Sequence, residues 1–162
     1  MTQDEELLIV HNFNLLSSSY MDLSSAVWEM LGESSYAFTR VIGMNVLQSL
    51  ENEFNLQVVD KPLEVLMKDL AEIFVEEFGF MKEINVEMQG DKKIVVKVNH
   101  CLFRGLCNKM MESGVKKPFN CSIMSTYAAA LDRSGYKMRN DIETWAEESG
   151  SIITFTNMRA SA

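Results

Sequence analysis

Cysteine and histidine side chains are the residues of this sequence that could bind a metal ion or act as nucleophiles. Cys101, Cys107 and Cys121 lie in the second half of the chain, and His100 precedes Cys101. Together they could supply a Cys3His zinc site, but neither Cys-x2-Cys nor His-x3-His spacing occurs. On a helix over 101–113, Cys101 and Cys107 would point about 120° apart. We therefore expect no metal site, and reduced, mostly unreactive thiols.

The sequence also lacks a recognisable catalytic set. His100 and Cys101 are sequence neighbours, whose side chains point in different directions on a helix or a strand. The chain has no Gly-x-Ser-x-Gly elbow, no Gly-x-Gly-x-x-Gly segment and no phosphate-binding loop. We expect no catalytic residues and no cofactor. Whether the protein is an enzyme is left open, and a non-catalytic role is preferred.

Composition narrows the class of protein further. The 162 residues are enough for one domain, with 15 basic and 23 acidic side chains and a formal charge of −8. This charge disfavours nucleic acids and anionic membranes as main partners. No apolar run reaches the roughly 18 residues of a membrane span, so we expect no membrane insertion. The acidic start, MTQDEELLIV, is unlike a secretory leader, and we expect a cytoplasmic protein.

The secondary structure that would position the cysteines and His100 can be predicted from the spacing of apolar residues, which changes along the chain. The first half predicts helices, although residues 4–20 show no clean period; Ser24 could cap a short helix ending at Gly32, and longer helices follow at 34–54 and 62–78. Apolar and polar residues then alternate over 82–88 and 94–98, with a turn at 89–92. Helices are predicted again at 101–113 and 119–133, then a second hairpin at 137–147 and 151–158. The order predicts an α+β domain: a four-stranded antiparallel sheet of two hairpins, with helices on one side.

Three segments of this second half carry a likeness to a known family. They read GFMKEINVEMQGDKKIVVKVNHCLF, PFNCSIMSTYAAAL and GYKMRNDIETWAEESGSIITF. In their order and spacing they resemble the 4-vinyl reductase domain family, whose superfamily includes TRAPP vesicle-tethering subunits and haem nitric-oxide-binding domains. The likeness covers roughly residues 34–158. It implies a hydrocarbon-binding module, with residues 1–33 as an N-terminal helical extension of a single domain.

The likeness fails at the zinc ligands that many members of that family carry. Ile142 stands at the position of a glutamate, and Trp145 and Ile153 stand where those members have cysteines. Neither an indole nor an aliphatic side chain can coordinate zinc. Cys121 is the only family-like ligand position that survives, so the resemblance also implies no metal site here.

The helix that begins near Phe119 is where we expect a hydrophobic ligand. Small residues on it, from Ser122 to Ala130, would let another element approach closely. The expected ligand contacts follow its apolar stripe: Phe119, Ile123, Met124, Tyr127 and Leu131. Tyr127 could give the single polar contact, or it could be a core residue whose hydroxyl meets a backbone carbonyl. A solid core without a pocket is the alternative.

Two functions remain open from the sequence. The first is a non-catalytic binding module for a small hydrophobic ligand, acting as a homodimer in which the apolar segment Leu7–Leu16 packs across a partner, with helix 34–54 contributing. The second is a scaffold or interaction protein, similar to tethering subunits, that holds no ligand. The sequence names neither the ligand nor the partner proteins.

Overall fold

A computed structural model describes residues 2–90 and 92–158. The first half is helical: α1 (Gln3–Leu31), a 3-10 turn (Gly32–Tyr36), α2 (Ala37–Phe54) and α3 (Leu63–Glu72), which ends in a π turn (Ile73–Glu77). The second half contains β1 (Glu83–Gln89), β2 (Lys93–Asn99), α4 (Arg104–Glu112), α5 (Ser122–Arg133), β3 (Met138–Trp145), a short 3-10 turn (Ala146–Glu148) and β4 (Gly150–Asn157). In the predicted turn at 89–92, Asp91 lies outside the described residues.

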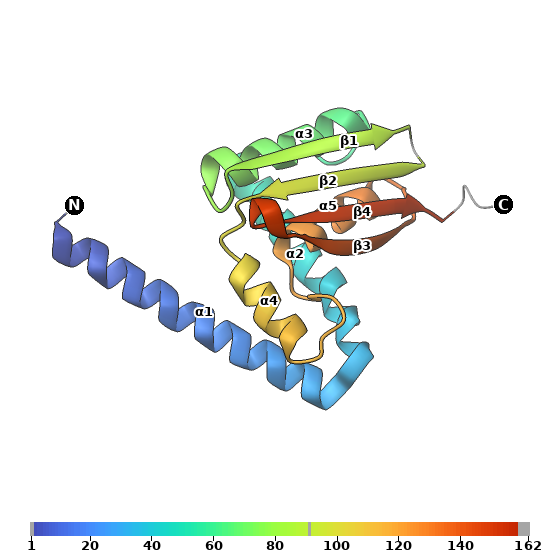
Figure 1. Cartoon of the computed structure of the whole chain (residues 1–162). Coiled ribbons are helices and arrows are strands. Elements are labelled where there is room, and N and C mark those ends of the chain that lie inside the picture. The colour runs from blue at the N-terminus through green and yellow to red at the C-terminus, as the bar shows by residue number, and fades with distance from the viewer. Residues whose placement is uncertain (1, 91, 159–162) are drawn as a thin grey trace.

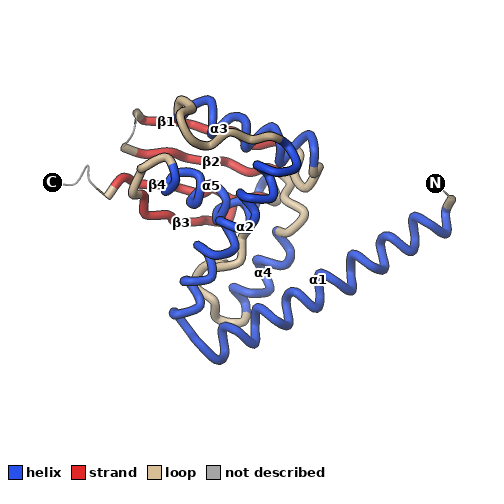
Figure 2. Tube along the Cα trace, turned by 180° about the vertical axis from the view of Figure 1, so that it is seen from behind, coloured by secondary structure: helices blue, strands red, loops and turns tan. Residues whose placement is uncertain are grey.

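The four strands form one antiparallel sheet in the order β1-β2-β4-β3, so the two hairpins meet at β2 and β4. Helices α3 and α5 lie against one face of this sheet, and α2 packs on the outer side of α5 (Figure 2). Residues Ile94, Val96 and Val98 of β2 form that face and are fully buried, whereas Val95 and Lys97 between them point to the opposite face and keep some exposure. The predicted α+β class, with helices on one side of the sheet, is confirmed.

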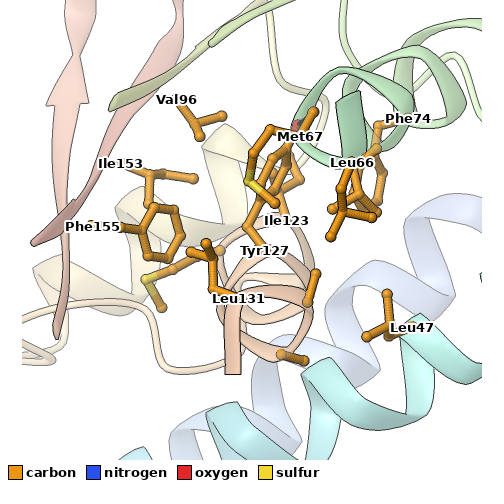
Figure 3. Close-up of a cluster of buried hydrophobic side chains, with 14 of the residues drawn as sticks. Leu47, Leu66, Met67, Phe74, Val96, Ile123, Tyr127, Leu131, Ile153 and Phe155 are labelled. Atoms are coloured by element: carbon orange, nitrogen blue, oxygen red, sulfur yellow. Dashed lines mark hydrogen bonds between the residues drawn. The ribbon is translucent and has the colours of Figure 1, made fainter. Parts of the chain in front are cut away.

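The main core lies between this sheet face and the helices, and α5 runs through its centre (Figure 3). Tyr127 is fully buried, and its ring lies near those of Phe74 and Phe155 at centroid distances of 6.4 Å each. On the other side of α5, Gly43 of α2 approaches the helix backbone so closely that a Cβ atom there would lie 2.0 Å from the Ser125 carbonyl oxygen. Only glycine permits this crossing of α2 and α5.

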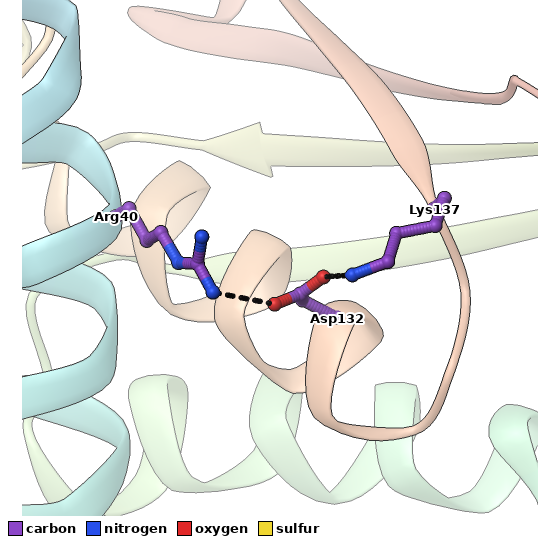
Figure 4. A network of polar contacts seen from close by, with 3 residues as sticks. All are labelled: Arg40, Asp132 and Lys137. Carbon is purple, nitrogen blue, oxygen red and sulfur yellow. Dashed lines mark hydrogen bonds and ion pairs between the residues drawn. The ribbon is translucent and has the colours of Figure 1, made fainter.

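One ion-pair network joins α2 to the end of α5 (Figure 4). Asp132 accepts from Arg40 Nη2 at 3.4 Å and from the ammonium group of Lys137, which precedes β3. The hydrogen bond from Lys137 lowers the pKa of Asp132. Because the two cations are exposed, this network adds little to stability; it links α2, the end of α5 and the residue before β3.

The N-terminal region is helical, as expected, but it is one continuous helix, which corrects the separate short helix after Ser24 and settles the ambiguous segment 4–20 as helix. Thr2 and Glu5 form a capping box at its start, and Gly32 ends it with a φ of 53°. Ser24 does not cap a helix, because its hydroxyl donates to the Tyr20 carbonyl oxygen within α1. The segment shows no clean apolar stripe because its first half extends away from the body and buries no single face (Figure 1).

Two other predicted helices begin later than expected. The helix predicted from 101 begins at Arg104, because His100 has a left-handed φ of 50° and residues 101–103 form a turn. The helix predicted from 119 begins at Ser122. Across residues 2–90 and 92–158, the helices are too short or too polar to span a bilayer.

Candidate functional site

A cavity of about 340 Å³ lies between α1, α4, the start of α5 and the helix-covered face of the sheet. Its walls are mostly apolar, and each element contributes: Phe13, Leu16 and Tyr20 from α1; Leu106, Cys107 and Met110 from α4; Cys121, Ser122 and Ile123 at the start of α5; Val98 from β2; Ile153 from β4. Cavities of this size and character hold small organic ligands in other proteins. This cavity is therefore the candidate functional site.

Helix α1 supplies one wall through residues that share a helical face. Phe13, Leu16, Ser17 and Tyr20 follow one another at spacings of three, one and three residues, and all four line the cavity. Leu16 is 69% exposed, so the cavity is open to solvent beside it. The helical spacing of these four residues is visible in the sequence, but the sequence did not show that they line a cavity.

Polar contacts hold α1 in place at the inner end of this wall. The Tyr20 hydroxyl donates to the Asn120 carbonyl oxygen at 2.9 Å, and Asn120 Nδ2 donates to Ser24 Oγ at 2.7 Å. Burial raises the pKa of Tyr20 to about 12, so the hydroxyl stays a donor at neutral pH. Beyond these contacts, Met21 packs on α4 and on the loop before α5, in a second apolar cluster that includes Phe119. The second half of α1 is thus anchored, whereas the first half is not.

All three cysteines line this cavity. The prediction that Cys101 and Cys107 point apart on one helix is wrong, because Cys101 precedes α4. Cys107 is buried, and Cys101 and Cys121 are half-buried. Burial raises the pKa of each thiol, to about 11 for Cys121, so all three are protonated at neutral pH. Protonated thiols are poor nucleophiles and poor ligands.

The cavity does not provide a metal or haem site from its own side chains. A site of four thiolates cannot form within one chain that has three cysteines. Neither histidine lines the cavity, and His100 is exposed. In the part of the chain that the structure describes, no three His, Cys, Asp or Glu side chains are grouped to hold a metal ion.

Among the described residues that line the cavity, Arg104 alone carries a charge at neutral pH. It is 7% exposed, and its Nη1 donates to Ser151 Oγ at 3.1 Å while its Nη2 donates to Thr144 Oγ1. Among the described residues, no carboxylate lies within 4.0 Å of its guanidinium group. Sequence reasoning missed Arg104, because nothing in the pattern around it shows that it becomes buried.

The five predicted ligand contacts do not form one wall. Ile123 lines the cavity, whereas Phe119 lies in the second apolar cluster. The remaining three belong to the main core: Met124, Tyr127 and Leu131 (Figure 3). The Tyr127 hydroxyl donates to the Met67 carbonyl oxygen at 3.1 Å, as in the alternative given for it above. The ligand role of these residues stays a prediction.

Comparison with solved structures shows the same fold in two kinds of protein. A trafficking protein particle complex subunit 3 from Naegleria fowleri, solved covalently bound to palmitic acid, matches with a TM-score of 0.59 at 13% identity, over 90% of this chain and 95% of that one. An H-NOX from Shewanella woodyi, bound to IWP-051, matches with a TM-score of 0.50 at 13% identity, over 90% and 73%. A second H-NOX protein, from a study of haem distortion, matches with a TM-score of 0.50 at 9% identity, over 83% and 68%.

At identities of 9–13%, these likenesses concern the fold, and it is the fold of the two kinds of protein that the sequence resemblance named. No curated protein sequence matches the chain. The family model that matches is not that of 4-vinyl reductase domains, and it covers residues 13–160, beginning at the first residue of α1 that lines the cavity. The chain belongs to the family described as "Putative rubredoxin C-terminal domain".

Proposed function

We propose that this protein is a non-catalytic module that binds a small hydrophobic ligand in the cavity between α1, α4 and the sheet. The observation that carries the proposal is an apolar cavity of about 340 Å³ in a chain of this size. At roughly the 30 Å³ that a water molecule occupies in the liquid, this volume accommodates about eleven non-hydrogen atoms. The hydrocarbon binding implied by the resemblance to 4-vinyl reductase domains is part of this proposal.

The fold neighbours support a ligand-binding role without naming the ligand. One was solved covalently bound to palmitic acid and another bound to IWP-051, so two proteins of this fold carry a ligand. The protonated thiols and the absence of a recognisable catalytic set favour binding over catalysis.

A homodimer and a cytoplasmic location complete the proposal. Apolar side chains between Leu7 and Leu16 are more than half exposed: Leu7, Leu8, Ile9, Val10, Leu15 and Leu16. On α2, Phe38 and Val41 are exposed as well. Exposed apolar side chains gathered on one segment, as on the first half of α1, are typical of an interface. In this proposal, residues 1–33 are an extension that pairs with a second copy, and residues 34–158 form the core domain.

The alternative is a scaffold protein that holds no ligand, in the manner of a tethering subunit. The same exposed apolar surface favours it, and so does the likeness to a subunit of a trafficking complex. The two functions differ in what they require of the cavity: a binding module must take up a ligand there, whereas a scaffold need not.

Ligand uptake can be tested with a neutral fluorescent probe of matching size, 1-aminonaphthalene, and a pair of serine variants. Ser122→Leu places an isobutyl group in the cavity wall, whereas Ser49→Leu makes the same change on the exposed face of α2. We expect the Ser122→Leu variant to lose most of the probe binding, and the Ser49→Leu variant to bind like the parent protein. Equal binding by all three proteins, or none by the parent, would contradict the proposal.

Oligomeric state is tested separately by light scattering after size-exclusion chromatography. The double change Leu8→Lys and Leu15→Lys alters two exposed α1 side chains that do not line the cavity, and Val59→Lys alters an exposed apolar residue of a loop. We expect the parent and the Val59→Lys variant to be dimers, and the double variant to be a monomer. A monomeric parent at micromolar concentration would remove the dimer and leave the ligand proposal standing.

A further inference from the structure

Arg104 is a buried cation whose charge is balanced by no carboxylate among the residues that the structure describes. Its two partners are the hydroxyl groups of Ser151 and Thr144, which are neutral acceptors. Buried charged side chains are normally paired, because an unpaired charge loses its hydration without compensation. Arg133, by contrast, is more exposed and pairs with Glu51. The charge of Arg104 therefore needs an anion, and the described part of the chain does not provide one.

The sheet register holds this guanidinium group in one place. Thr144 of β3 and Ser151 of β4 are direct cross-strand partners, so their hydroxyl groups lie side by side on the sheet face that carries Ile153; Ser151 is buried there and Thr144 is exposed. Arg104, at the start of α4, reaches both of them. A guanidinium group has five N–H donors, and two are occupied here. Fixed in this way, the group is ready to donate its remaining N–H groups to a planar anion.

The cation and the apolar walls belong to the same cavity. Arg104 and Ser151 line it, so the hydrogen bond between them lies in its wall. Val98 is the cross-strand partner of Ser151 on the other side, and Ile153 follows two residues along β4. The three thiols nearby are protonated and therefore add no negative charge. One positive charge thus stands at one side of a pocket that is otherwise apolar or neutral.

We propose that the cavity binds a hydrophobic monocarboxylate, with its carboxylate on Arg104 and its hydrocarbon part against the apolar walls; this rests on the function proposed above. A single positive charge balances a carboxylate, whereas a phosphate monoester would bring nearly two negative charges to it. The planar fork of a guanidinium group also matches a carboxylate with two hydrogen bonds. The cavity volume limits the enclosed part of the ligand to a medium-length chain or a small aromatic acid.

The test compares two ligands of equal shape on the unmodified protein. Decanoate and decanamide have the same chain and differ in the charge of the head group. Isothermal titration calorimetry at neutral pH should give a dissociation constant for decanoate that is roughly 10- to 100-fold lower, the range expected for charged hydrogen bonds. Equal affinities would leave the hydrophobic cavity in place and overturn the role of Arg104. Binding of neither ligand would overturn the proposed function and this inference together.

Variants of Arg104 then separate recognition from structural support. Arg104→Gln removes the charge, Arg104→Lys keeps it without the fork, and Lys109→Gln removes an exposed charge from the same helix. We expect Arg104→Gln to reduce the decanoate preference to within a few-fold, Arg104→Lys to keep part of it, and Lys109→Gln to leave it unchanged. Equal weakening of both ligands by Arg104→Gln would show a purely structural residue. If Arg104→Gln does not fold, the unmodified protein and Arg104→Lys decide the matter.

Discussion

Replacing Gly43 with alanine tests the closest helix crossing of the structure. In an exposed helix this change stabilises, because glycine is about 1 kcal/mol less favourable than alanine in a helix interior. Here the new Cβ atom would lie 2.0 Å from the Ser125 carbonyl oxygen and 3.2 Å from the Ala129 Cβ atom. A Cβ contact essentially never falls below 3.0 Å, so α2 and α5 must separate by about 1 Å.

The net effect follows from two opposing contributions. Forcing extra volume into a packed contact costs about 1–3 kcal/mol and occasionally more. We expect a cost at or above the top of that range, because the obstacle at 2.0 Å is a backbone carbonyl and not the end of a flexible side chain. After subtraction of the helix-propensity gain, Gly43→Ala should lower the free energy of unfolding by about 2 kcal/mol. For a chain of this length, that is a fall of about 4–8 °C in Tm.

Urea unfolding followed by circular dichroism measures this change directly. Gly105→Ala is the matched control, because Gly105 is exposed in α4, has no positive φ and would place its Cβ atom in open space. The control should be unchanged or stabilised by up to about 1 kcal/mol. If Gly43→Ala is as stable as the parent protein, α2 and α5 do not cross as closely as described.

Three further predictions concern the core and the thiols. Tyr127→Phe should lower the free energy of unfolding by about 0.5–1.5 kcal/mol, through loss of the bond to the Met67 carbonyl oxygen, and leave probe affinity unchanged; weaker probe binding would restore Tyr127 as a ligand contact. Burial raises the pKa of Cys121 to about 11, so as the pH rises the unfolded chain loses the thiol proton before the folded protein does. The free energy of unfolding should therefore be unaffected by this thiol below about pH 9 and should fall by roughly 2–3 kcal/mol as the pH rises to about 11. Unfolding at several alkaline pH values should show a shallower decline for Cys121→Ala, and identical slopes would contradict burial of the thiol. Elemental analysis should find no stoichiometric zinc, and about one zinc per chain, lost on Cys121→Ser, would refute this.

Much of the fold can be predicted from the spacing of apolar residues, because a strand or helix that packs on the core places its apolar residues on the buried face at regular intervals. The alternation of Ile94, Val96 and Val98 predicted β2, and the small residues of α5 predicted the close approach that Gly43 makes. The helical nature of residues 1–33 was predicted, but the unbroken length of α1 was not, because a helix that leaves the body need not confine its apolar residues to one stripe.

The site was harder to predict than the fold for a related reason. A cavity is formed by what several elements leave unfilled, and no single element's pattern records it. The predicted ligand contacts were the most regular apolar stripe of the chain, and most of that stripe packs in the two apolar clusters. Arg104 donates hydrogen bonds to Ser151 and Thr144, which lie 40 residues or more away in the sequence, so its neighbours in the sequence do not reveal its surroundings.

Helix α1 is both a wall of the cavity and, in its first half, an apolar surface without cover (Figure 1). Phe13 and Leu16 face the cavity, and Leu8 and Leu15 lie exposed on the same helix. A partner that fixes the angle of α1 against the body therefore changes the width of the cavity, and a ligand that sets this width changes the direction of α1. Thermodynamic reciprocity requires the two effects to be equal in free energy: a partner that tightens ligand binding tenfold is itself bound tenfold more tightly when the ligand is present.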